Sequence, residues 1–111
     1  HVFRPWGEFK NIHTEKGFQI KILIIYPKNK ISLQYHNKRS EHWVIVKGTA
    51  KIQVGKDFHI LHPNQSIYIP VTVLHRAENI GNDMVELIET QIGEYLGEDD
   101  IVRYEDDFGR V

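Results

Sequence analysis

The feature that most constrains the fold of this chain is a succession of short β-prone runs, each ended by a turn signal. The runs are rich in Ile, Val, Tyr and Phe, while Gly, Pro, Asn and Asp gather between them. We expect strands at 18–26, 32–36, 41–46, 50–54, 58–61, 66–70, 72–79 and 85–92. No long window repeats the spacing of an amphipathic helix, so the pattern predicts an all-β sandwich or small barrel.

The two ends of the chain fall outside this strand pattern. The RPWG stretch at residues 4–7 is typical of an arm that docks on the barrel, with Pro5 restricting the backbone and Trp6 covering the core. Residues 98–105 are expected to form one short C-terminal helix. We expect residues 1–111 to be one domain, and a piece of a longer chain because the sequence starts without Met and stops abruptly.

Charge and hydropathy exclude several classes of partner. The net charge of −1 provides no basic field that would recruit nucleic acid or an acidic membrane. The longest apolar run, ILIIY at 22–26, is too short to cross a bilayer. The chain has no cysteine, which excludes disulfide and thiolate chemistry. A cytoplasmic protein without nucleic-acid or membrane partners is therefore expected.

Four polar side chains stand at or near strands with apolar neighbours. Side chains alternate across a strand, so Gln34 and His36 share one face, and Glu41 shares another with Trp43. His75 lies in the later run 72–79. Two imidazoles, one carboxylate and one amide suit a divalent ion such as zinc, iron, manganese or cobalt. Such a set leaves coordination positions open, which indicates a catalytic metal site and not a closed structural one.

The spacing of these four residues resembles the two motifs of cupin barrels. The matching residues are Gln34, His36, Glu41 and Gly48 in the first motif and Pro70, Thr72, His75 and Asn79 in the second. The resemblance implies a double-stranded β-helix, also called a jelly-roll barrel. Lys28, Asn64 and Thr72 stand where that pattern has glycines, and we expect those turns to differ in shape because lysine and threonine adopt a left-handed backbone poorly.

A more specific resemblance extends over nearly the whole chain. Its stretches are RPWGEF (4–9), LQYHNKRSEHWVIVKGTA (33–50), NQSIYIP (64–70), HRAEN (75–79) and LIETQIGEYLGEDDIVRYEDDFGR (87–110). They are similar to the type II mannose-6-phosphate isomerases, in particular to the C-terminal cupin half of bifunctional mannose-1-phosphate guanylyltransferase/mannose-6-phosphate isomerases. In that family a glutamine replaces the first cupin histidine, as Gln34 does here.

The resemblance implies an activity, a cofactor and partners. The expected enzyme interconverts mannose 6-phosphate and fructose 6-phosphate in GDP-mannose and polysaccharide precursor synthesis. Gln34, His36, Glu41 and His75 would bind one divalent metal ion, with zinc favoured and cobalt, manganese or another divalent ion as alternatives. The substrate is a phosphorylated hexose and a homodimer is expected. The family's nucleotidyltransferase half is absent from these residues, so guanylyltransferase activity is expected to lie outside them.

Three further residues are candidates for catalysis. The resemblance links Arg39 to isomerase activity, whereas the alternative is a surface charge in the loop NKRSEH. Lys21 either points into the barrel, where burial would lower its pKa, or lies exposed on a strand edge. Glu89 stands in an otherwise apolar strand, as a general base or as a structural partner of Lys21. The candidates for binding the phosphate are Arg39, Arg76, Lys21 and Arg103.

Two other functions remain as hypotheses. The first is a non-catalytic cupin module that binds a sugar or nucleotide-sugar. The second is an iron-dependent cupin oxygenase, which Gln34 disfavours because such sites usually use three histidines or two with a carboxylate. In the tail, Asp99, Asp100 and Arg103 either close the pocket or form a solvated acidic face.

Overall fold

The computed structural model of this protein describes residues 1–105, which form strands and turns. The strands are β1 Val2–Arg4, β2 Gly7–Glu15, β3 Phe18–Ile25, β4 Leu33–Tyr35, β5 Arg39–Lys47, β6 Ala50–Val54, β7 Asp57–Leu61, β8 Ser66–Ile69, β9 His75–Asn79, β10 Val85–Gly93 and β11 Val102–Glu105. Within this described part, no helix has the length and apolar character needed to cross a membrane. The last residues of the family-like tail, 106–110, lie outside it.

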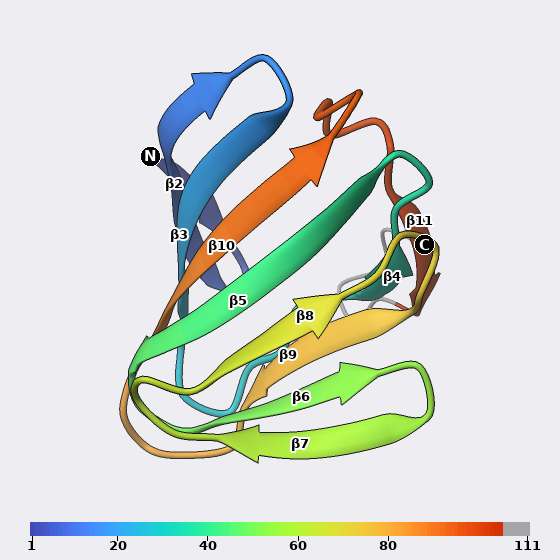
Figure 1. The fold of residues 1–111 in the computed structure, drawn as a ribbon. Coiled ribbons are helices and arrows are strands. Elements are labelled where there is room, and N and C mark those ends of the chain that lie inside the picture. Colours follow the sequence, from blue (N-terminus) through green and yellow to red (C-terminus); the bar gives the residue numbers. More distant parts are fainter. Residues whose placement is uncertain (106–111) are drawn as a thin grey trace.

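The strands form two antiparallel sheets that face each other across one core (Figure 1). One sheet has six strands in the order β1-β2-β3-β10-β5-β8, and the other has five in the order β11-β4-β9-β6-β7. Large apolar side chains from both sheets fill the space between them, including Trp43, Ile52 and Leu87, each at most 1% exposed. The all-β jelly-roll prediction is thereby confirmed.

The two chain ends differ from their predicted form. Residues 98–105 were expected to be helical, but this prediction is wrong: residues 102–105 form β11, which pairs antiparallel with β4. The edge of β4 offers backbone groups for pairing, and these hydrogen bonds between segments far apart in the sequence outweigh the local helical preference of residues 102–105. The N-terminal arm is docked as expected, with Trp6 buried in the core, but as the paired strands β1 and β2.

Strand register places the polar candidate residues on the interior faces. In β10, Glu89 lies opposite Lys21 of β3 on one side and opposite Trp43 of β5 on the other. In the second sheet, Gln34 of β4 lies opposite His75 of β9. Because directly paired residues share a face of a sheet, each pair projects to the same side. The register thus directs side chains from both sheets into one interior.

Three turns hold non-glycine residues in a left-handed backbone. The φ angles are 63° at Lys28, 74° at Asn64 and 68° at Thr72. We expected these turns to differ in shape from a glycine-containing pattern, but all three keep the conformation for which glycine is suited. Gly48, the motif glycine between β5 and β6, has a φ of 80°, and a Cβ atom there would lie 2.6 Å from the carbonyl oxygen of Met84.

Candidate metal centre

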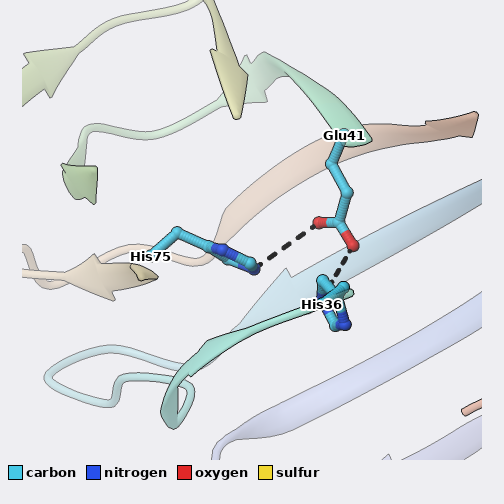
Figure 2. Close-up of side chains that lie close together, drawn as sticks. All are labelled: His36, Glu41 and His75. Carbon is cyan, nitrogen blue, oxygen red and sulfur yellow. Dashed lines mark ion pairs between the residues drawn. The ribbon is translucent and has the colours of Figure 1, made fainter. Parts of the chain in front are cut away.

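Three buried side chains converge between the two sheets. His36 follows β4, Glu41 lies in β5 and His75 begins β9, and Figure 2 shows the two rings pointing toward the carboxylate. Glu41 Oε2 is 3.0 Å from His36 Nε2, and Glu41 Oε1 is 3.8 Å from His75 Nε2. One ligand atom from each residue lies within 4.8 Å of the others, which is close enough to share one metal ion.

The hydrogen bonds of the two imidazoles direct their Nε2 atoms toward Glu41. His36 Nδ1 donates to the backbone carbonyl of Asp100 at 2.8 Å, and His75 Nδ1 donates to that of Val73 at 3.0 Å. A carbonyl oxygen only accepts, so each neutral ring carries its proton on Nδ1 and a lone pair on Nε2. The Nε2 atom of His75 is buried without a hydrogen-bond partner, as expected of an atom suited to bind a cation.

Burial and mutual charge drive the pKa values of Glu41 and Glu89 apart. Burial raises the pKa of Glu89 well above its usual range, and the neighbouring Glu41 carboxylate raises it further. Burial opposes ionisation of Glu41 too, but a hydrogen bond from Glu89, together with the neighbouring imidazoles of His36 and His75, holds the Glu41 pKa well below its usual range. The indole Nε1 of Trp43 donates to Glu41 at 2.9 Å and to Glu89 at 3.3 Å. The two environments thus favour ionisation of Glu41 over ionisation of Glu89.

Burial also lowers the pKa of His75, because a charged ring would lose its hydration there. A neutral imidazole is the form that binds a metal ion. The donor set of two imidazoles and an ionised carboxylate thus fits a divalent cation, and its chemistry does not by itself select zinc over cobalt or manganese.

Gln34, the fourth predicted ligand, lies beside His75 on the neighbouring strand. Its Oε1 atom accepts a hydrogen bond from the Ser32 hydroxyl at 2.7 Å, and its side chain lines a cavity next to the three converging residues. The cross-strand position places Gln34 on the interior face with His75, with its amide oxygen held by Ser32.

Arg39 is a buried residue that joins this group to the cavity. Its side chain is 3% exposed, so the surface-charge alternative is wrong. The guanidinium donates from Nε to Glu41 Oε2 at 2.9 Å and from Nη2 to His36 Nε2 at 3.3 Å. Arg39 therefore provides a cationic partner for the Glu41 carboxylate in this structure.

The cavity has a volume of about 130 Å³ and lies between the two sheets. Four predicted site residues line it, namely Lys21, Gln34, Arg39 and Glu89, together with Arg103. Lys21 is 5% exposed, so the alternative of an exposed strand edge is wrong, and burial lowers its pKa. These residues come from β3, β4, β5, β10 and β11, which only the closed fold brings together.

Other residues lie elsewhere than the sequence indicated. Arg76 borders a separate hollow with Lys51 and Glu78 and donates to the carbonyl of Ile31 at 2.8 Å, so it is excluded from the cavity. Asp100 is buried, and its carboxylate accepts hydrogen bonds from the backbone amides of Asn37 and Lys38 in the loop after β4. Asp99 is therefore exposed to solvent, whereas Asp100 is not.

Sequence reasoning missed three residues of the site. Arg4 and Glu98 both line the cavity, and no local pattern marks either of them. Gln91 is fully buried, and its amide Nε2 donates to Glu89 at 3.3 Å. The alternation of β10 contained that signal, because Gln91 stands two residues after Glu89 and shares its face.

Comparison with known proteins gives a consistent match along the chain. Residues 1–106 match the family described as mannose-6-phosphate isomerase C-terminal. The xanthan biosynthesis protein XanB of Xanthomonas campestris pv. campestris is 50% identical over 110 residues, which is 99% of this chain and 24% of XanB. A mannose-1-phosphate guanylyltransferase of Salmonella montevideo is also 50% identical, covering 98% of this chain and 23% of its own length. The chain therefore spans about a quarter of the length of these relatives.

A solved structure supports the fold independently of sequence. An uncharacterized conserved protein with a double-stranded β-helix domain from Klebsiella pneumoniae superposes with a TM-score of 0.80. The match covers 95% of this chain and 92% of that protein, at 15% sequence identity. At this identity the likeness concerns the fold alone.

Proposed function

This chain belongs to the family of mannose-6-phosphate isomerase C-terminal domains, and from that premise we propose that it is a metal-dependent isomerase of mannose 6-phosphate and fructose 6-phosphate. The observation that carries the proposal is the convergence of His36, Glu41 and His75 beside a cavity of about 130 Å³ lined by cationic side chains. A metal site next to positive charge suits a phosphorylated sugar.

The reaction moves a proton between C1 and C2 of the open-chain sugar through an enediol. The difficulty is that a proton beside a carbonyl is very weakly acidic. Gln34, His36, Glu41 and His75 are proposed to hold the divalent ion. When bound, that ion would supply Lewis-acid stabilisation of the negative charge that develops during proton transfer.

The catalytic roles follow from what each side chain contacts. Arg39 lies against Glu41 and His36, and its fixed charge is placed to stabilise a developing oxyanion. Glu89 lines the cavity beside them, so its carboxyl is the proposed acid–base group that moves the proton. Lys21 pairs with a carboxylate in the cavity wall, and its ammonium therefore suits binding of a substrate anion better than proton abstraction.

The wider setting is also a proposal. The names of the relatives point to GDP-mannose and polysaccharide precursor synthesis, with guanylyltransferase activity in sequence that these 111 residues do not include. We further propose zinc as the ion and the cytoplasm as the compartment. We also propose that the protein is a homodimer, and sedimentation velocity tests this assembly. The edge strand β7, with exposed Phe58 and Ile60, is a surface through which two copies could pair.

A coupled assay of mannose 6-phosphate conversion, with and without chelator, tests the activity. We expect activity in the wild type that chelator removes, and a loss of roughly a hundredfold or more in His75→Ala, because the substitution deletes a metal ligand. The matched control is His42→Ala, since the exposed His42 follows Glu41 on the opposite face of β5 and should be neutral.

Two outcomes would contradict the proposal in different ways. Activity that survives both chelator and His75→Ala would remove the metal from the mechanism. Binding of the sugar phosphate without any turnover would favour the non-catalytic binding module instead.

A further inference from the structure

One carboxylate in the cavity wall lies against two buried cations. Lys21 Nζ donates to Glu98 Oε1, and Arg39 Nη2 lies 3.9 Å from Glu98 Oε2. Lys21 and Arg39 have side chains that are 7% and 3% exposed, whereas the Glu98 side chain is 52% exposed. The cations are therefore fixed in the protein, and the anion between them faces solvent.

Further positive charge lies next to this pair. The guanidinium of Arg4 is 5.4 Å from the centre of the Phe9 ring, and the ammonium of Lys21 is 4.8 Å from the same centre. Both cations line the cavity, as does Arg103. Arg39 connects the group to the candidate metal centre through its contacts with Glu41 and His36. The cavity thus gathers several cations, and Arg39 joins them to the candidate metal ligands.

Glu98 belongs to the connection between β10 and β11, which is anchored on both sides of it. Before Glu98, the carbonyl of Leu96 lies 3.5 Å from Arg39 Nη1. After it, the Asp100 carboxylate accepts from the backbone amides of Asn37 at 3.1 Å and Lys38 at 2.9 Å. The backbone therefore holds Glu98 at the cavity, and rotation of its side chain alone would release the cations.

We propose that Lys21 and Arg4 bind the phosphate of the substrate, and that Glu98 is an internal anion which this phosphate displaces from Lys21. The inference rests on the proposed function, because it assigns the cavity residues that bind the phosphate of the sugar. A phosphate monoester carries more charge and more acceptor oxygens than a carboxylate, so it competes well for the same cations. Displacing Glu98 consumes part of the binding free energy, which weakens the apparent affinity.

The test is a phosphorus-31 NMR titration of inorganic phosphate into the metal-free chain. Without metal, phosphate cannot bind to the ion, and without turnover the result does not depend on isomerase activity. We expect Glu98→Gln to bind phosphate about three- to tenfold more tightly than the wild type, which corresponds to the loss of a partly exposed ion pair. Glu94→Gln is the matched control, because Glu94 is an exposed acid of the same loop.

A second pair of variants tests the cations. Lys21→Met should lose most phosphate binding, while Lys21→Arg should retain it, and circular dichroism checks that both are folded. Equal or weaker phosphate binding in Glu98→Gln would overturn the proposal, as would the same gain in Glu94→Gln, which would indicate a general effect of charge. If the variants bind phosphate as expected but the coupled assay detects no sugar conversion, the isomerase proposal is refuted while the anion site stands.

Discussion

Asp100 is a buried aspartate whose role is to fix the position of His36. Its backbone carbonyl accepts a hydrogen bond from His36 Nδ1. Its carboxylate accepts hydrogen bonds from two backbone amides in the turn after β4. The side chain is thus placed to hold the acceptor that orients the ring of a candidate metal ligand. An acid in this position acts through another residue and not on the substrate.

We predict that Asp100→Ala weakens metal binding by about ten- to a hundredfold, because the acceptor of His36 loses its anchor. The substitution also leaves the amides of Asn37 and Lys38 without an acceptor, which should cost about 1–3 kcal/mol of unfolding free energy. A metal titration against a competing chelator and a urea melt measure the two effects. The control is Asp99→Ala, which removes an exposed acid from the same loop; equal losses in both variants would refute the positioning role.

Lys21 makes stability depend on pH in a defined direction. Burial lowers its pKa in the folded state below the value of 10.5 that it has when unfolded. Between these two values the unfolded chain binds more protons, so the contribution of Lys21 to stability rises with pH and falls as pH decreases. We predict that the unfolding free energy of the wild type, relative to Lys21→Met, increases from pH 7 toward pH 10, as measured by urea melts. A difference that stays constant with pH would contradict the lowered pKa.

Turns, and not strands, carry the local strain of this fold. Thr72 lies between β8 and β9 with a φ of 68°, a left-handed backbone that β-branched residues rarely adopt. Its amide donates to the carbonyl of His36 at 2.7 Å. The turn therefore connects the segments that carry two candidate ligands, His36 and His75, and its hydrogen bond accounts for why the strained backbone is kept.

We predict that Thr72→Gly stabilises the chain by about 0.5–1 kcal/mol. Glycine removes the left-handed strain of about 1–2 kcal/mol. Part of this stabilisation is lost, because glycine also gives the unfolded chain more conformational entropy. Thermal and urea melts measure the change. Val71→Gly is the control, because Val71 is an exposed β-branched neighbour outside the left-handed set, and this variant should be destabilised. Destabilisation of Thr72→Gly to the same degree would refute the strain argument.

The two sheets of the molecule contribute different ligands to the candidate metal centre. Glu41 belongs to the six-stranded sheet, and His75 belongs to the five-stranded sheet. A shared ion would therefore join the two layers of strands that can be followed in Figure 1. Metal binding at this place should stabilise the whole fold, since the unfolded chain lacks the assembled site.

We predict that a divalent ion at about a hundred times its dissociation constant raises the melting temperature by about 10 °C, because such binding adds about 2.7 kcal/mol. Chelator should reverse the shift. His36→Ala should abolish it, whereas His59→Ala should not, since His59 lies exposed on β7. An undiminished shift in His36→Ala, measured by differential scanning calorimetry, would place the ion elsewhere.

The sequence by itself determined the strands and the faces of their side chains. The runs that become β3, β6, β8 and β10 are predicted almost to the residue, because alternation and turn chemistry are local properties. The same alternation turns Glu41 and Trp43 inward together. It fails at residues 7–15 and 102–105, where polar edge strands depend on pairing with β3 and β4.

Only the tertiary structure decided which residues meet. Lys21 and Glu98 are 77 residues apart, and His36 and Asp100 are 64 apart, yet each pair is in contact. Such contacts depend on strand order, closure of the two sheets and the path of the β10–β11 loop. None of these produces a periodic pattern in the sequence. A side chain's face follows from backbone geometry within a few residues, whereas its neighbours follow from the free energy of packing the whole barrel.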